Sequence, residues 1–509
     1  MSGLLSNIAM GLGVAVTPIN LVYCLIGVVV GTFVGVLPGF GPTTTIALLL
    51  PLTFKLQAIP SFVMLAGIYY GAHHAGSTTA IMLNMPGEPS SVVICLDGHP
   101  MARMGRTGPA LCIAALSAFA AGCISIIIVA LFSPVLAMAA LTMGAPDYCA
   151  VVLLALVATS ALSPGSFTKT MAMAMFGMLL GVVGTDTFSG VRRFTFGFAE
   201  LADGINLVPL AIGLFAFAEV ISRVGQEEVR QRFGRIRGLI PTVADLGAAW
   251  KPVLRGTALG AVLGMLPGTG PLISSFASYS MERRIAADPS RFGKGAIEGV
   301  AGPEAADNAA ALTHFVPMLT LGIPAGAPMA LMLGALMIQG IIPGPLLMVQ
   351  HADLFWGAIA SMWVGNAVLL VLNLPLVGIW VRLLSIPYRF LYPCIVVLCC
   401  IGAYSVRNSL FDVEMAAVFG IAGYFLHLIE CPPAPLLLGF ILGPIFEENL
   451  RRALLISQGN LVVFVTHPIS ATVLGVVVLV VLGHVYAAIH NQRLGLRASR
   501  PMPTQNAGR

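Results

Sequence analysis

Charged residues are scarce in this chain: Asp, Glu, Lys and Arg make up only 9% of it, whereas apolar residues make up 58%. A soluble domain carries about 25% charged residues, so this composition excludes a water-exposed globular surface. Charge is absent altogether from residues 1–54, 107–146 and 453–492. A helix crosses the hydrocarbon layer with roughly 20 apolar residues, so each of these stretches can hold at least one membrane span.

The motifs of common catalytic and metal sites are also missing. The nine cysteines include no C-x-x-C pair, so neither a disulfide framework nor a cysteine metal site is indicated. There is no H-E-x-x-H, no G-x-S-x-G and no P-loop lysine, and we therefore expect neither an enzyme nor an ATPase. The net charge of +5 comes from basic residues between apolar stretches, which argues against nucleic-acid binding.

The long apolar runs predict an all-α, polytopic integral membrane protein with about ten to twelve transmembrane helices. A β-barrel would instead need short segments of alternating polarity. Basic residues mark cytoplasmic loops in membrane proteins, which orients the chain. The predicted parts are a first membrane repeat (1–225), a basic cytoplasmic linker (226–255), a second membrane repeat (256–490) and a disordered cytoplasmic tail (491–509).

A glycine–proline segment occurs twice in apolar surroundings. GTFVGVLPGFGP (31–42) and GAVLGMLPGTGP (260–271) share seven of twelve residues at an offset of 229. Gly and Pro interrupt helices, and lipid tolerates an interrupted helix only where protein or a water-filled cavity surrounds the freed backbone groups. Interrupted helices at matching positions in two halves are typical of transporter substrate sites. We therefore predict a membrane carrier with two repeats, expected to be inverted relative to each other.

The second break lies between basic clusters at 223–255 and 283–294. Each apolar arm beside the break has about a dozen residues, roughly 18 Å of helix, which is too short to cross the bilayer. Basic flanks on both sides favour a re-entrant hairpin that enters and leaves at the cytoplasmic face. A single kinked spanning helix is the alternative.

Small hydroxyl residues follow each break, after a proline. Pro suits the first helical turn and a hydroxyl there can bond free N–H groups, so each G-x-G-P segment should begin a helix inside the protein. A helix N-terminus carries about half a positive charge and free N–H donors, and it can bind an anion without Lys or Arg. The alternative is that Gly and Pro only permit close helix packing.

A second pair of small, polar segments follows further along each half, and each precedes a proline-rich break. These are Ala75–Ala80 with Leu83–Pro89, and Gly302–Ala309 with Leu321–Pro328. The candidate substrate-binding residues of all four segments are glycines, hydroxyls and amides: Gly39, Gly41, Thr43, Thr44, Thr45, Ser77, Thr78, Thr79, Asn84, Gly268, Gly270, Ser274, Ser275 and Asn308.

Acidic residues near these breaks are candidates for coupling to H⁺ or Na⁺, because an acid at membrane depth is usually functional. They are Asp307, Glu304 and Glu88, and the alternative role is a cap or an ion pair near the interface. No organic cofactor is expected, and Na⁺ could bind backbone carbonyls of the broken helices. Two adjacent histidines on a helix point about 100° apart, so we do not expect His73 and His74 to line one site. We expect Asp97 in a solvated loop.

The breaks and several further blocks resemble the large membrane subunit of tripartite tricarboxylate transporters. The similar blocks span residues 20 to 470 in the order of that family: both Leu-Pro-Gly-x-Gly-Pro segments, Gly76–Ser91, Asp97–Gly105, Arg193–Gly197, Pro303–Asn308, Thr320–Pro324, Asn408–Asp412, Pro435–Pro444 and Glu447–Arg452. Two stretches depart from the pattern. The histidines at 73–74 and Thr313-His314-Phe315 place bulkier groups near the expected site, so citrate is not assumed as the substrate.

The resemblance implies the translocating subunit of a secondary active transporter. Such a subunit imports small di- or tricarboxylates by cation symport with alternating access, in the bacterial inner membrane. Its partners are a periplasmic receptor and a small membrane subunit. A receptor-independent carboxylate symporter or an anion channel is the alternative, and a purely structural subunit is a third reading.

Overall fold

Helices form almost all of the regular structure, as the composition predicts. The computed structural model describes residues 2–37, 40–163, 165–186, 188–223, 238, 240–268, 270–376, 378–380 and 388–493. Three predictions fall wholly or partly outside these residues. They concern Gly39, most of the linker before residue 240 and the tail beyond residue 493.

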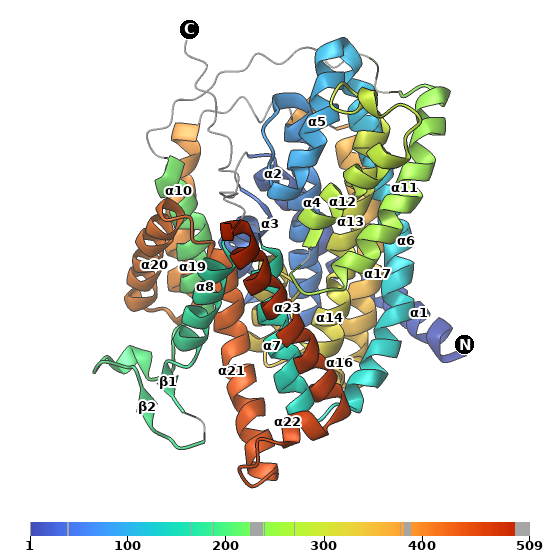
Figure 1. The fold of residues 1–509 in the computed structure, drawn as a ribbon. Coiled ribbons are helices and arrows are strands. Elements are labelled where there is room, and N and C mark those ends of the chain that lie inside the picture. The colour runs from blue at the N-terminus through green and yellow to red at the C-terminus, as the bar shows by residue number, and fades with distance from the viewer. Residues whose placement is uncertain are drawn as a thin grey trace.

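The elements follow one another along the chain as shown in Figure 1. The first part contains α1 (Ser2–Ala15), α2 (Pro18–Gly35), α3 (Pro42–Leu49), α4 (Ala58–Leu83), α5 (Val92–Met101), α6 (Thr107–Leu141), α7 (Ala145–Leu162), α8 (Phe167–Gly181), β1 (Gly184–Thr185), β2 (Arg192–Arg193), α9 (Leu207–Ala211) and α10 (Ala218–Arg223). The second part contains α11 (Val243–Gly264), α12 (Gly270–Ile285), α13 (Glu298–Thr313), α14 (Phe315–Leu321), α15 (Ala327–Ile338), α16 (Leu347–Gln350), α17 (Ala352–Asn373), α19 (Tyr388–Arg407), α20 (Leu410–Leu428), α21 (Pro433–Ile456), α22 (Val463–Thr466) and α23 (Pro468–Arg493). Short 3₁₀ or π-helical turns are η1 (Leu50–Thr53), η2 (Pro89–Ser91), η3 (Ala102–Arg106), η4 (Ala199–Leu201), η5 (Ile212–Phe217) and η6 (Pro289–Arg291).

By length and composition, six helical segments in the described part of the chain could cross a membrane. They are Pro18–Gly35, Pro89–Leu141, Ala145–Leu162, Ala352–Asn373, Leu410–Leu428 and Pro468–Ala487. Five further apolar helices have only 10–17 residues: Gly3–Ala15, Pro42–Thr53, Phe167–Gly181, Ala327–Ile338 and Leu391–Arg407. The expected number of about ten to twelve is reached only when these shorter helices are included, because some apolar stretches are interrupted.

The second glycine–proline break lies in a helical hairpin rather than in one kinked helix. α11 runs into the molecule and ends at Gly264, and α12 begins at Gly270 and runs back (Figure 1). Arg255, midway along α11, pairs with Glu282 in the last turn of α12, with Nε 2.8 Å from Oε1. The arms are longer than the expected dozen residues, because α11 already begins at Val243.

Glycines spaced four residues apart bring two pairs of helices into backbone contact. These glycines, related by the 229-residue offset, are Gly27, Gly31 and Gly35 on α2 and Gly256, Gly260 and Gly264 on α11. They face Met64, Ile68 and Ala72 of α4 and Gly302, Ala306 and Ala310 of α13, respectively. A Cβ added to any of the six would overlap a backbone atom of the facing helix. Both pairs therefore pack in the small-residue manner typical of membrane helices.

Contacts within and between the two pairs set their relative directions. Within each pair the residue numbers of facing positions rise together, so α2 is parallel to α4 and α11 is parallel to α13. Between the pairs the order reverses. His73 of α4 contacts Asp307 of α13, whereas Ser77 contacts Glu304, which precedes Asp307. The α2–α4 pair therefore runs opposite to the α11–α13 pair.

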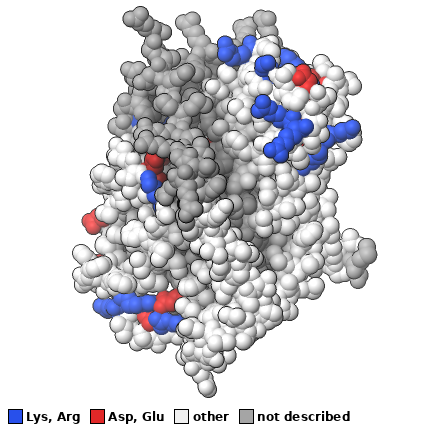
Figure 2. Space-filling view, in the orientation of Figure 1, with Lys and Arg blue, Asp and Glu red and all other residues white. Residues whose placement is uncertain are grey.

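Lys and Arg residues gather at the upper right of Figure 2, and a second group, mixed with acidic residues, lies at the lower left. The Arg106–Asp245 ion pair joins the turn after α5 to the first turn of α11, with Nη2 2.6 Å from Oδ1.

Asp97 on α5 is completely buried, and it accepts hydrogen bonds from the Tyr279 hydroxyl and from two backbone N–H groups before α13. The prediction of a solvated loop for Asp97 is therefore wrong, because its partners lie in the second half of the chain.

A short hairpin projects at the lower left of Figure 1. Strands β1 and β2 are antiparallel, with Gly184 opposite Arg193 and Thr185 opposite Arg192. Arg193 also pairs with Glu447 of α21, with Nη1 2.7 Å from Oε1, and this ion pair fastens the hairpin to the helices.

Replacing Gly260 by alanine tests the contact between α11 and α13. The new methyl group would overlap the carbonyl of Ala306, and overpacking of this kind costs about 1–3 kcal/mol. Gly475→Ala on α23 is the matched control, because a Cβ at that position meets nothing within 4 Å. We expect a lower melting temperature in detergent for Gly260→Ala, and an unchanged or slightly higher one for the control. Equal melting temperatures would contradict the backbone contact.

Candidate functional site

A cavity of about 820 Å³ lies among the helix breaks and is lined by both halves of the chain. The starts of three helices face it. These are Gly41 and Pro42 at α3, Gly270 and Pro271 at α12, and Gly326 to Pro328 at α15. Residues of α4, η2, α5, α7, η5, α10, α20 and α21 also line it.

Glycine is the N-cap of two of these helices and the first residue of the third, Gly270 of α12. Gly41 is the N-cap of α3 and Gly326 is the N-cap of α15, and neither makes a side-chain hydrogen bond. The first N–H groups of a helix lack an intrahelical partner and carry the positive end of the helix dipole. The three starts therefore present backbone donors and positive potential to one cavity, which favours a bound anion.

The local sequence explains where the helices stop. α4 ends before Asn84, which has a left-handed backbone (φ 56°), and α14 ends before Gly322 in the same way (φ 71°). A proline two residues later prevents either helix from continuing. Gly268 (φ 81°) lies in the other break of the second half, and its N–H donates to the Ala325 carbonyl at 3.0 Å. The two breaks of this half are thus joined directly.

The predicted hydroxyls after the breaks fall into two groups. Thr43 and Thr44 line the cavity and can contact a ligand there. Thr45 and Ser274, which are related by the 229-residue offset, each donate to the carbonyl four residues earlier, at 2.9 and 3.0 Å. Ser275 donates to a carbonyl of α13 at 3.3 Å. The hydroxyl protons of these last three residues are therefore already used by the protein.

Other predicted contact residues do not line this cavity. Thr78 is buried elsewhere, and Thr79 donates to the Gly76 carbonyl at 2.9 Å. Asn84 is exposed at the C-terminal end of α4. The predicted substrate-binding residues that the structure brings to the cavity are Gly41, Thr43, Thr44, Gly268 and Gly270.

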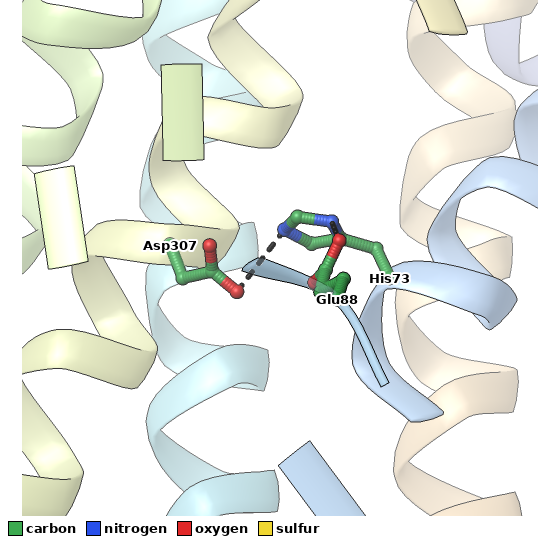
Figure 3. Close-up of side chains that lie close together, drawn as sticks. All are labelled: His73, Glu88 and Asp307. Carbon is green, nitrogen blue, oxygen red and sulfur yellow. Dashed lines mark ion pairs between the residues drawn. The ribbon is translucent and has the colours of Figure 1, made fainter. Parts of the chain in front are cut away.

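His73 of α4 lies between two carboxylates (Figure 3). Its Nδ1 is 2.9 Å from Glu88 Oε2, and its Nε2 is 3.1 Å from Asp307 Oδ2. The other oxygen of each carboxylate has no hydrogen-bond partner among the described residues. Glu88 and His73 also line the cavity, and the possible ligand atoms of all three side chains lie within 4.8 Å of one another. This cluster can hold a proton or a small cation beside the cavity.

Glu304 is fully buried one helical turn away and has different partners. Ser77 Oγ donates to its Oε2 at 2.6 Å, Asn308 Nδ2 donates to its Oε1 at 3.1 Å, and His74 Nδ1 lies 3.4 Å from Oε1. His74 and Asn308 line a separate pocket of about 10 Å³, which is no larger than one water molecule needs. The adjacent histidines thus face different sites, as the helix geometry predicts. The hydrogen bonds to both oxygens of Glu304 fit a structural role.

Sequence reasoning missed several residues that line the cavity. Glu219 and Arg223 form an ion pair within α10, and Arg223 is the only Lys or Arg among the described lining residues. Tyr69 and His427 also line it. Glu219, Arg223 and His427 have no fixed sequence distance from the breaks, because α10 and α20 reach the cavity only through the tertiary fold. His314 also lines the cavity, and the sequence analysis named it only as one of the bulkier groups near the expected site.

A known protein family matches most of this chain. The model of the tripartite tricarboxylate transporter TctA family matches residues 21–438. This chain belongs to that family. The family consists of transporters rather than enzymes, and it is the large subunit of a tripartite transporter, so partner subunits are implied. With its apolar helices, the TctA family chain is a multi-pass membrane protein.

Two similar proteins come from Agrobacterium vitis. One is an uncharacterized 52.8 kDa protein in the TAR-I ttuC' 3' region, 52% identical over 477 residues that cover 94% of this chain and 95% of that protein. The other is an uncharacterized protein in the TAR-II ttuC' 3' region, 55% identical over 234 residues, or 46% of this chain and 97% of that protein. No solved structure matches this chain.

The environment of Glu304 predicts that Ser77→Ala is destabilising. The substitution leaves a buried carboxylate oxygen without its hydroxyl donor, which costs about 1–3 kcal/mol. Ser133→Ala is the matched control, because the Ser133 hydroxyl is buried and has no partner among the described residues. Thermal unfolding in detergent should show the larger loss for Ser77→Ala. Equal effects would mean that Ser77 does not stabilise Glu304.

Proposed function

We propose that this chain is the translocating subunit of a secondary active, receptor-dependent transporter that imports small di- or tricarboxylates together with Na⁺ or H⁺. The observation that carries this proposal is that one cavity is lined by three helix starts and lies beside the Glu88–His73–Asp307 cluster. One part of the cavity suits an anion and an adjacent part suits a cation, as symport requires.

The groups that line the cavity suit an anion that binds and leaves again, rather than one that stays permanently bound. Arg223, the one Lys or Arg among the described lining residues, is already paired with Glu219. A free permanent cation at membrane depth would cost several kcal/mol and would hold an anion strongly. Backbone N–H groups at helix starts attract a carboxylate without that penalty, so the bound substrate can also leave.

The helix directions support two inverted membrane repeats that work by alternating access. The α2–α4 pair and the α11–α13 pair pack through matching glycines and run in opposite directions. In transporters with inverted repeats, the substrate site lies at the repeat interface near the bilayer midplane. The cavity between the breaks of both halves corresponds to such a site.

The family supports the choice of partners and location. A tripartite transporter needs two further components, and we propose a periplasmic receptor and a small membrane subunit in the bacterial inner membrane. The basic segments around Arg106 and Arg283 would then face the cytoplasm, following the positive-inside rule.

Uptake into proteoliposomes tests this function. The vesicles contain the purified chain and its small membrane partner, and they receive radiolabelled di- and tricarboxylates under an imposed Na⁺ or H⁺ gradient. We expect uptake only when both the gradient and the cognate receptor are present. Uptake without the receptor would support an autonomous carrier or channel, and no uptake under any gradient would contradict the transport function.

The carboxylate cluster predicts a separate effect for Asp307→Asn. Removing this charge should lower gradient-driven accumulation at least tenfold, because the cluster loses a site for the coupling cation. Asp353→Asn is the matched control, since Asp353 is exposed in the first turn of α17. Initial uptake rates with and without the gradient distinguish coupling from binding. Full gradient-driven uptake by Asp307→Asn would remove the coupling role.

A further inference from the structure

His314 lies at the junction of α13 and α14, with its side chain at the cavity. The residue is 2% exposed, and neither ring nitrogen has a hydrogen-bond partner among the described residues. Burying a polar group without a partner is costly, so unpaired nitrogens facing a cavity point to a missing ligand.

The ring of His314 lies between two of the three helix starts. Its Cε1 would be 3.8 Å from a Cβ built on Gly270 and 3.9 Å from a Cβ built on Gly326. The first turns of α12 and α15 therefore converge on the same imidazole. Because both positions are glycine, no side chain fills the space between the ring and the backbone donors.

The third helix start, at α3, has a different electrostatic environment. A Cβ on Gly41 would lie 3.8 Å from the Cβ of Glu88, so an acidic residue stands directly beside this start. By contrast, the described cavity residues nearest α12 and α15 in sequence, 268–272 and 325–328, include no acid. The charge distribution within the cavity is thus uneven between the two halves of the chain.

We propose that a carboxylate group of the substrate binds at the starts of α12 and α15, where a ring N–H of His314 donates a hydrogen bond to it. The backbone N–H groups of the two helix starts supply the remaining donors. The start of α3 lies beside Glu88, whose negative charge disfavours a carboxylate there. This inference rests on the proposed function and deepens it, because it assigns the anion to the second half of the chain.

Direct binding to the purified chain in detergent tests this assignment, with radiolabelled succinate, malate and citrate as probes. His314→Leu removes the donor, and His314→Gln keeps one. His351→Leu is the matched control, because His351 is exposed before α17 and lies outside the lining of the cavity. We expect His314→Leu to weaken binding about 10- to 100-fold, as loss of a hydrogen bond to a charged group does. His314→Gln and His351→Leu should retain most of the affinity.

A second pair of variants keeps the test valid even if His314→Leu does not fold. Gly326→Ala adds a methyl group beside the imidazole, yet its Cβ has no neighbour closer than 3.9 Å in the free protein. Gly41→Ala adds the same group at the start of α3, with no neighbour closer than 3.8 Å. We expect Gly326→Ala to reduce carboxylate affinity more strongly than Gly41→Ala.

The outcomes separate this inference from the proposed function. If the unmodified chain binds a carboxylate but His314→Leu or Gly326→Ala binds it equally well, the position of the anion is wrong and transport remains supported. A stronger effect of Gly41→Ala than of Gly326→Ala would place the carboxylate at α3 and overturn the inference. If the unmodified chain neither binds nor transports any of the three carboxylates, both the inference and the proposed function fail.

Discussion

Backbone groups that are freed by an interrupted helix need partners inside the protein, and the rest of this structure depends on that constraint. Each break must be enclosed, so all of them meet in the interior, and the N–H of Gly268 in one break bonds to the Ala325 carbonyl in another. The first N–H groups of a helix lack an intrahelical partner, and the starts of α3, α12 and α15 face one cavity. Enclosing the breaks therefore also creates the site.

The uneven charge of the cavity gives the two halves of the chain different chemistry despite their similar sequences. Glu88 and His73 come from the first half, and they meet Asp307 across the interface. Glycine and alanine occupy the start of α15, where the first half has Glu88. Sequence repetition therefore supplies the framework of breaks, and a few substitutions between the copies make the charge of the cavity uneven.

The positions of the breaks could be predicted from sequence, because a Leu-Pro-Gly-x-Gly-Pro segment places several residues that disfavour a continuous helix side by side. The hydroxyls were less predictable: Thr45 and Ser274 bond to their own helices, and nothing in their spacing separates them from Thr43 and Thr44. The partners of Asp97 lie in a distant part of the chain, so the sequence around Asp97 does not indicate that it is buried. Asp97 was predicted to lie in a loop, whereas Tyr279 and the turn before α13 enclose it in the structure.

The glycine contacts have a mechanical consequence. Helices whose backbones touch along three successive turns resist sliding or rolling against each other, so α2 with α4, and α11 with α13, should each move as one rigid body. Relative motion is then concentrated at the surface between the bodies, where α4 meets α13. His73 and Asp307 bridge that surface. Any displacement of one body against the other would therefore also pull the His73 imidazole away from the Asp307 carboxylate.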